Sequence, residues 1–146
     1  MRMESIFPNI EPSDFWKLMT SEEDRIKWDK RYINAKVLGH NDAEGSTILH
    51  ACSNRPPGGG LVIAQRDFVI EAFRCKDGLG EGRNIAIGCT VEHAEAPPAN
   101  GWFDYVRATV HLQAGLVEKN PNGPGTRLLE LRHTNPNGGM MEAVIN

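Results

Sequence analysis

The ten-residue stretch VRATVHLQAG, residues 106–115, alternates polar and small apolar side chains over most of its length. This alternation predicts a β-strand, because successive side chains of a strand face opposite sides of the sheet. The polar face of the strand would carry Arg107, Thr109, His111 and Gln113. Two interpretations follow for this polar row. Either it faces water over an apolar core, or it lines a cavity that holds a partly polar molecule.

The composition is that of one soluble globular domain spanning residues 1–146, with 40% hydrophobic and 24% charged residues. A net charge of −3 argues against a nucleic-acid partner, which would be bound through clustered Lys and Arg. The three cysteines include no CxxC pair and predict free thiols in a reducing compartment. The N-terminus lacks the apolar stretch of a secretory signal, and no apolar run approaches a membrane span. We therefore expect a cytoplasmic protein.

Periodicity along the chain predicts an α+β fold. Residues 11–32 place apolar side chains at helical spacing and predict one or two short helices. About six strands joined by hairpin-length turns follow, so the sheet should be antiparallel. We expect them at residues 35–40, 46–53, 61–73, 83–93, 106–118 and 126–135. Residues 137–146 predict a turn that enters a helix, too short here to cover a sheet of this size, so a partner, a ligand or a further segment should complete the cover.

Patterns typical of catalysis or metal binding are weak. The chain has no GxSxG motif and no cysteine in a recognisable catalytic setting. Glu92, His93 and Glu95 lie close together, but their spacing matches no established ligand set, and we interpret them as a solvated strand end. We expect no metal and no cofactor.

Polar residues interrupt the apolar stretch 61–73 at Gln65, Arg66 and Asp67. They indicate either a structural Arg–Asp ion pair or a polar group that reaches into a cavity. An arginine in a cavity would pair with a phosphate or a buried acid, because an unpaired buried charge is too costly.

Two loops allow a functional and a structural interpretation. The aromatic loop 97–105 either plugs one end of the core or touches a membrane interface at the mouth of a cavity. The glycine-rich loop 54–60 has the composition of a mobile gate, although hairpin loops often share it.

Five short motifs, in this order along the chain, resemble the START (StAR-related lipid transfer) domain. They are RIKWD (25–29), QRDFV (65–69), CTVEHAEAP (89–97), VRATVHL (106–112) and TNPNGGM (134–140). The resemblance covers nearly the whole chain, is closest to phosphatidylcholine- and ceramide-transfer members, and indicates truncation at both ends. It implies a helix-grip fold, in which a curved antiparallel sheet and a long C-terminal helix enclose a tunnel for one lipid. It also implies a non-enzymatic protein that carries or senses this lipid between membranes.

The resemblance implies particular lipid contacts. His111 matches a head-group contact of ceramide-transfer members, which would put the polar row inside the tunnel. Gln65 matches another ceramide contact, whereas Arg66 matches an arginine that helps to hold phosphate in phosphatidylcholine-transfer members. Neighbouring side chains of a regular strand cannot both face inward, and we favour Gln65. The expected lipid-binding residues are Gln65, Arg66, Arg107, His111, Gln113 and Glu130.

The head group stays open between phospholipid, sphingolipid and sterol. Glu130 replaces a tyrosine of ceramide-transfer members, and Ala72 replaces the buried arginine of sterol-transfer members. A carrier must also release its cargo, so at least one of the two loops should move, and the protein should touch a membrane surface transiently. The expected gate or membrane-contact residues are Pro57, Gly59, Leu61, Trp102 and Phe103.

Two alternatives remain at this point. A truncated START-like interaction module without transfer activity would expose an apolar sheet face, and would have further domains or form a homodimer. A helix-grip enzyme of the cyclase type would use His111 as a general base near neutral pH.

Overall fold

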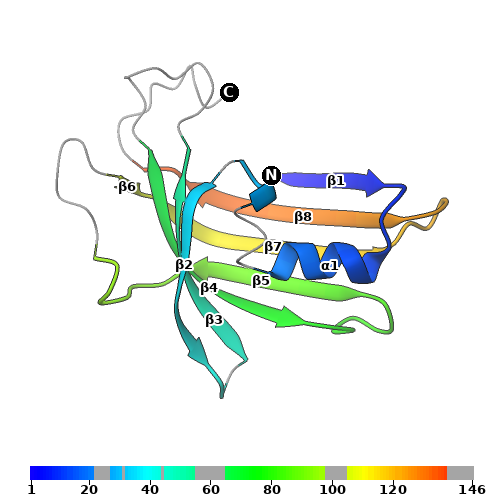
Figure 1. Ribbon diagram of the computed structural model, residues 1–146, viewed down its shortest axis with the longest axis horizontal. Coiled ribbons are helices and arrows are strands. Elements are labelled where there is room, and N and C mark those ends of the chain that lie inside the picture. The colour runs from blue at the N-terminus through cyan, green and yellow to red at the C-terminus, as the bar shows by residue number, and fades with distance from the viewer. Residues whose placement is uncertain (22–26, 31, 44, 55–64, 98–104, 138–146) are drawn as a thin grey trace.

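The computed structural model describes residues 1–21, 27–30, 32–43, 45–54, 65–97 and 105–137. Its main feature is one sheet of eight strands, seven of them in the order β1-β8-β7-β5-β4-β3-β2. The strands are β1 (Arg2–Phe7), β2 (Tyr32–Asn41), β3 (Ser46–Ser53), β4 (Arg66–Cys75), β5 (Asn84–Thr90), β6 (Val106–Arg107), β7 (Thr109–Lys119) and β8 (Thr126–Asn135). Figure 1 shows β2 and β3 running at a steep angle to β1, β8 and β7, so the sheet is strongly twisted and curved. The expected helix-grip sheet is confirmed, with more strands than the six predicted.

One helix, α1 (Pro12–Thr20), lies across the sheet over β7 (Figure 1). Pro12 suits its first turn because the proline nitrogen has no hydrogen to leave unpaired there. The buried Phe15 side chain packs against Val117 and Leu128, and its ring lies 4.6 Å from that of Phe7. We call the side of the sheet that contacts α1 the inner face and the other side the outer face.

Differences from the predicted elements are concentrated at the N-terminus and at residue 108. Strand β1 was not expected, although alternate residues of this segment are half-buried against β8. The predicted strand 106–118 is two strands, and the short β6 pairs in parallel with β4 in an otherwise antiparallel sheet. The last strand, β8, has the predicted bounds. Of the predicted C-terminal helix, only Asn137 falls within the described residues.

A β-bulge at His111 interrupts the alternation of β7. Val110 lies opposite Thr134 of β8 and Leu112 lies opposite His133, so His111 is an additional residue without a partner in this register. The His111 side chain is exposed, and its ring centroid lies 4.6 Å from that of His133. A bulge of one residue reverses which side chains face each side of the sheet.

The expected single polar face therefore does not form. Beyond the bulge, Gln113 lies on the inner face with Val117, whereas Arg107 and Thr109 before the bulge lie on the outer face. Nothing in the alternating sequence pattern marks the position of this bulge.

On the outer face, the buried Glu118 carboxylate connects β7 to its neighbours. Arg83 Nε donates to Glu118 Oε2 at 3.0 Å, and Arg127 Nε donates to Oε1 at 2.9 Å. Burial by itself would raise the pKa of Glu118, but the hydrogen bonds from the two arginines hold it below its ordinary value. This network joins β7 to β8 and to the residue that precedes β5.

Candidate functional site

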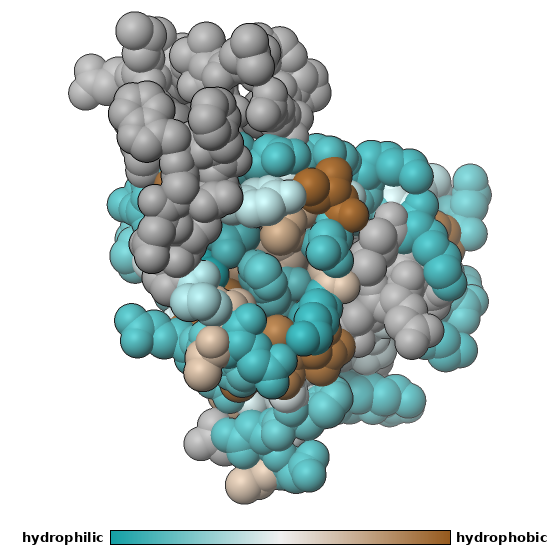
Figure 2. All heavy atoms as spheres, turned by 60° about the vertical axis from the view of Figure 1, so that its left-hand side comes forward, coloured by the Kyte–Doolittle hydropathy of each residue, from teal (hydrophilic) through white to brown (hydrophobic). Residues whose placement is uncertain are grey.

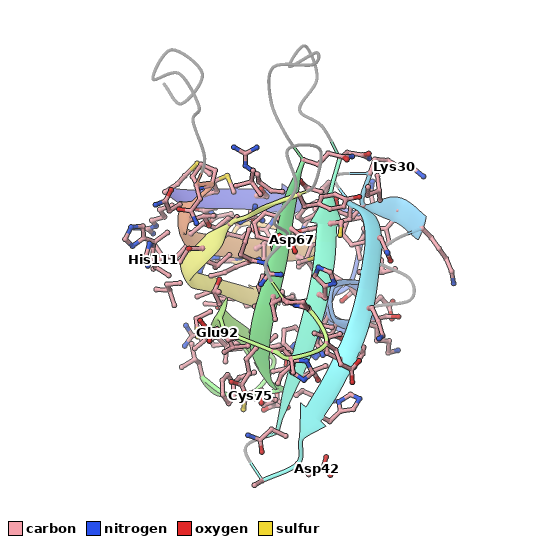
Figure 3. The ribbon with its side chains drawn as sticks, turned by 90° about the vertical axis from the view of Figure 1, so that its left-hand side faces the viewer. Lys30, Asp42, Asp67, Cys75, Glu92 and His111 are labelled. Atoms are coloured by element: carbon pink, nitrogen blue, oxygen red, sulfur yellow. The ribbon has the colours of Figure 1, made fainter. Side chains whose placement is uncertain are left out.

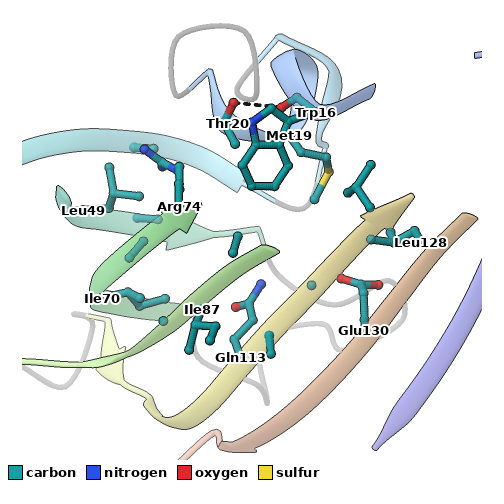
Figure 4. A pocket seen from close by; sticks show the side chains of 18 of the residues that line it. Trp16, Met19, Thr20, Leu49, Ile70, Arg74, Ile87, Gln113, Leu128 and Glu130 are labelled. Carbon is teal, nitrogen blue, oxygen red and sulfur yellow. Dashed lines mark hydrogen bonds between the residues drawn. The ribbon is translucent and has the colours of Figure 1, made fainter. Parts of the chain in front are cut away.

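A groove with a cavity volume of about 130 Å³ lies between α1 and the inner face of the sheet (Figure 4). Its lining is predominantly apolar. The larger apolar side chains come from α1 and from the strands β3, β4, β7 and β8, and include Trp16, Met19, Leu49, Ile70, Val117 and Leu128. The described residues leave the groove partly open to solvent.

Figure 2 shows that hydrophilic side chains dominate one face of the molecule, with apolar residues confined to small patches.

Small residues on the central strands make room for the groove. Ala72, Gly88 and Gln113 are successive neighbours across β4, β5 and β7, and Ala86 and Gly115 follow in the next row. Side chains no larger than a methyl group at four of these five positions leave space above the sheet. Ala86, Gly88 and Gly115 were not predicted to lie at a site, although Ala86 and Gly88, like Gln113 and Gly115, are two residues apart and therefore share one face of their strand.

Polar groups are few within the groove. Gln113 and Glu130 both line it, and Figure 4 shows them on the neighbouring strands β7 and β8. Arg132 lies directly opposite Gln113 and donates from Nη2 to Glu130 Oε1. Arg74 of β4 also lines the groove. Gln113 and Glu130 were expected at a lipid site, whereas Arg74 and Arg132 were not.

Two other expected contacts lie away from the groove. Arg107 is on the outer face, where its guanidinium binds Asp67 and donates to the carbonyl oxygen of Ala96 at 2.9 Å. His111 projects outward from the bulge, and Figure 3 shows it at one side of the sheet, well apart from Asp67. The structure thus separates these two residues from Gln113 and Glu130, and it places the imidazole considered as a general base outside the groove.

Arg66, rather than Gln65, shares the inner side of β4 with Ile70. Its guanidinium is buried beside the end of β8, where Nε donates to the Pro136 carbonyl and Nη2 to the Asn137 carbonyl, both at 2.9 Å. Burial lowers the pKa of Arg66. Through these two bonds the Arg66 side chain holds the chain where it leaves β8. Gln65 is half-buried outside the groove lining.

Asp67 belongs to a structural ion pair, as one of the two interpretations of this segment predicted, but its partner is Arg107 and not the adjacent Arg66. Arg107 Nη2 lies 2.8 Å from Asp67 Oδ2, and His50 Nε2 lies 3.0 Å from the same oxygen. Burial alone would raise the pKa of Asp67, but the bonds from Arg107 and His50 and their charges lower it. Burial also raises the pKa of the neighbouring Cys52 thiol, which argues for an unreactive cysteine.

The expected gate and membrane-contact residues, Pro57, Gly59, Leu61, Trp102 and Phe103, lie outside the described residues. Within the described part of the chain, no helix is long and apolar enough to cross a membrane. The same residues contain no cluster of three or more His, Cys, Asp or Glu side chains that could hold a metal ion. Glu92 and Glu95 at the end of β5 are exposed, and Glu95 pairs with Lys36.

A curved antiparallel sheet with an apolar groove along its inner face defines a protein of the helix-grip class. A family model of the START domain matches residues 1–146, and the chain belongs to this family. A comparison with curated protein sequences gives no match.

Solved structures show the same fold. Human StAR-related lipid transfer protein 5 matches 99% of this chain with a TM-score of 0.81 at 22% identity, and human STARD10 matches 99% with 0.82 at 17%. A STAR-related lipid transfer protein from Xanthomonas axonopodis matches 99% with 0.67 at 17% identity. The chain spans 64% and 54% of the two human chains and 73% of the bacterial one.

Proposed function

We propose that the protein binds a single lipid in the groove between α1 and the inner face and carries or senses it between membranes. The observation that carries the proposal is the groove itself. It is mainly apolar with few polar groups, and it lies on the sheet of a family that includes a StAR-related lipid transfer protein. Apolar chains gain about 25 cal/mol for each Å² they remove from water, so such a groove favours a lipid over a polar metabolite.

The size of the groove bears on how a lipid would lie in it. Ligand pockets typically enclose roughly 300–1,000 Å³, whereas this groove encloses about 130 Å³. We therefore propose that only part of the lipid lies within the groove and that the rest extends beyond the open side of the groove. Gln113 and Glu130 would then contact the polar part of the lipid.

Uptake and release require contact with a membrane surface. We propose that residues 55–61 and 102–103 make this contact, in line with their glycine-rich and aromatic sequences. We expect this to take place in the cytoplasm, where the three thiols stay reduced.

Native mass spectrometry of the purified chain, followed by organic extraction, tests lipid binding. We expect one lipid per chain, identified in the extract. Gly115→Phe is the blocking variant, because Gly115 lies in the floor of the groove and a phenyl ring would fill it. Gly115→Ala is its control, since an added Cβ meets only Leu128 Cδ1, at 3.9 Å. Wild-type protein free of lipid even after incubation with vesicles, or equal occupancy in Gly115→Phe, would overturn the proposal.

A second candidate is an interaction module, favoured by the outer face. Phe73 and Ile87 lie opposite each other on β4 and β5, and Leu131 lies in the same row on β8. These side chains are 36%, 41% and 46% exposed, and apolar side chains exposed together in one row are typical of an interaction surface. Light scattering after size-exclusion chromatography tests this candidate. A dimer that Leu131→Glu dissociates would support it, and a monomer at all concentrations would exclude self-association.

A further inference from the structure

The bulge in β7 brings two histidines together on the outer face of the sheet. His133 of β8 follows Arg132, which lies opposite Gln113 of the inner face, so the His133 side chain faces outward. The ring of the bulged residue His111 meets it there, with the two ring centroids 4.6 Å apart. Bulges commonly re-aim a side chain in this way. Both histidines are exposed, and Figure 3 shows His111 at one side of the molecule.

The ring nitrogens of this pair are not used within the described fold. Among the described residues, neither His111 nor His133 takes part in a hydrogen bond or an ion pair, and their only recorded side-chain contact is with each other. The other three histidines each have a hydrogen-bond partner: Thr47 for His40, Asp67 for His50 and the backbone N–H of Glu95 for His93. The outer-face pair therefore offers nitrogen atoms of two imidazoles to one ligand.

The separation of the two rings fits a shared metal ion. Imidazole nitrogens bind divalent transition metals at about 2.1 Å. Two rings at neighbouring positions of one ion then have centroids roughly 4.5 to 5 Å apart, a range that includes the 4.6 Å between His111 and His133. The ring planes are inclined by 40°, so the rings do not lie flat on each other. Because both side chains are exposed, each ring can turn about its broad terminal torsion until a nitrogen faces the ion.

We propose that His111 and His133 form a two-ligand site for a divalent transition metal ion that prefers imidazole, the class of Zn²⁺, Ni²⁺ and Cu²⁺. Water fills the remaining positions, because the described residues bring no third His, Cys, Asp or Glu side chain to the pair. The ion joins β7 to β8 at the bulge. The sequence predicted no metal, since these histidines are far apart in the chain and only the register of the two strands brings them together. The site is separate from the proposed lipid groove and does not depend on it.

Isothermal titration calorimetry with NiCl₂ tests the site, on the whole chain purified without a polyhistidine tag. We expect wild-type protein to bind one Ni²⁺ per chain. His111→Ala and His133→Ala should each weaken the binding about a hundredfold, because losing one imidazole removes the second, intramolecular bond. His40→Ala is the matched control and should leave the affinity unchanged, since His40 is exposed on β2 at the far end of the strand order. MgCl₂ should give no binding heat, because Mg²⁺ prefers oxygen ligands.

Thermal unfolding supplies a second measurement. A metal bound by the folded chain alone raises the Tm, and at about one hundred times the dissociation constant of Ni²⁺ the rise should be roughly 5 to 10 °C in wild type. The rise should be far smaller in the two histidine variants. Without metal, these variants should unfold at the wild-type temperature, since both side chains are exposed. His111→Gln and His133→Gln, which keep a polar side chain, replace any alanine variant that does not fold.

Three results overturn the inference. The first is Ni²⁺ binding that both histidine variants retain, or that His40→Ala loses to the same extent. The second is binding that Cys89→Ser abolishes and the histidine variants keep, which would assign the metal to the exposed Cys89 thiol. The third is saturation only at millimolar Ni²⁺, which would mean an adventitious ion only.

Discussion

Arg107 holds the Asp67 carboxylate on the outer face through two hydrogen bonds, from Nε to Oδ1 at 3.0 Å and from Nη2 to Oδ2 at 2.8 Å. The Asp67 side chain is only 5% exposed, and the Arg107 side chain is 16% exposed. The pair joins β4 to β6, the one parallel connection in the sheet. Arg107 therefore fixes the strand through which the chain returns to the sheet after residues 98–104.

Arg107→Met should destabilise the protein by about 3–5 kcal/mol, because it leaves the Asp67 carboxylate buried without its main partner. Chemical unfolding in urea measures this change. The double variant Asp67→Asn, Arg107→Met should recover much of the loss, since no buried charge remains. Lys36→Met is the control. It removes an ion pair with Glu95 in which both side chains are about 60% exposed, and should cost less than about 1 kcal/mol. Equal effects of the two single variants would contradict the assignment.

The stability of the protein should fall in acid through Asp67. Its pKa is lower in the folded chain than its ordinary value, so the unfolded chain binds the proton more readily. The stabilisation is complete above the ordinary aspartate pKa of about 4 and is lost as the pH falls toward the lowered folded value. Urea unfolding from pH 7 to pH 3 should show a smaller decrease for Asp67→Asn than for wild type. Parallel pH curves for the two proteins would show that other carboxylates, such as Glu118, account for the acid effect.

How far the sequence predicts this fold depends on the element. Strand β8 was predicted with its full bounds, because turn-forming residues precede and follow its apolar stretch in the sequence. Strand β1 was missed, since residues 2–7 alternate only weakly and gain their order from pairing with β8, whose paired residues lie 119 to 129 positions further along the chain. Pairing over such a separation leaves no local signal.

The residues of the candidate site could likewise be predicted only in part. Of the residues predicted to contact a lipid, Gln113 and Glu130 line the groove, whereas Arg107 and His111 lie away from it. A single extra residue in β7 separates them, and a bulge of this kind is set by the register with β8 rather than by local sequence. Arg74 also lines the groove and was overlooked, because the predicted strand 61–73 ends one residue before it.

Gly125→Ala should be strongly destabilising. Gly125 has a φ of 86°, and an added Cβ would lie 2.1 Å from the carbonyl oxygen of Phe7. Either effect alone disfavours alanine, and the clash is with backbone that cannot move without disturbing β1. We expect a loss of more than about 1 kcal/mol. Gly123→Ala is the control in the same turn, because its nearest neighbour is the Asn120 side chain at 3.5 Å. A Gly125→Ala variant as stable as Gly123→Ala would contradict this account of the turn.

Phe15→Ala should detach α1 from the sheet and so weaken the groove. Phe15 is 7% exposed, and it is the buried residue by which the helix packs against Val117 and Leu128. Loss of a buried phenyl ring costs about 3–5 kcal/mol. Part of that cost should appear as local opening of α1, because the helix contacts the sheet mainly through this side. Hydrogen exchange should be faster in residues 12–20 of the variant than in β7 and β8.

The Phe15→Ala variant also tests whether α1 only covers the sheet or forms part of the ligand site. Trp16 and Met19 reach the groove from α1, so a loosened helix removes one of its walls. If a lipid occupies the groove, lipid occupancy should fall in Phe15→Ala by more than the loss of folded protein. Leu18→Ala provides the comparison, since Leu18 is 41% exposed on the same helix and its loss should change stability by less than about 0.5 kcal/mol. Unchanged occupancy in folded Phe15→Ala would mean that the sheet binds the lipid without α1.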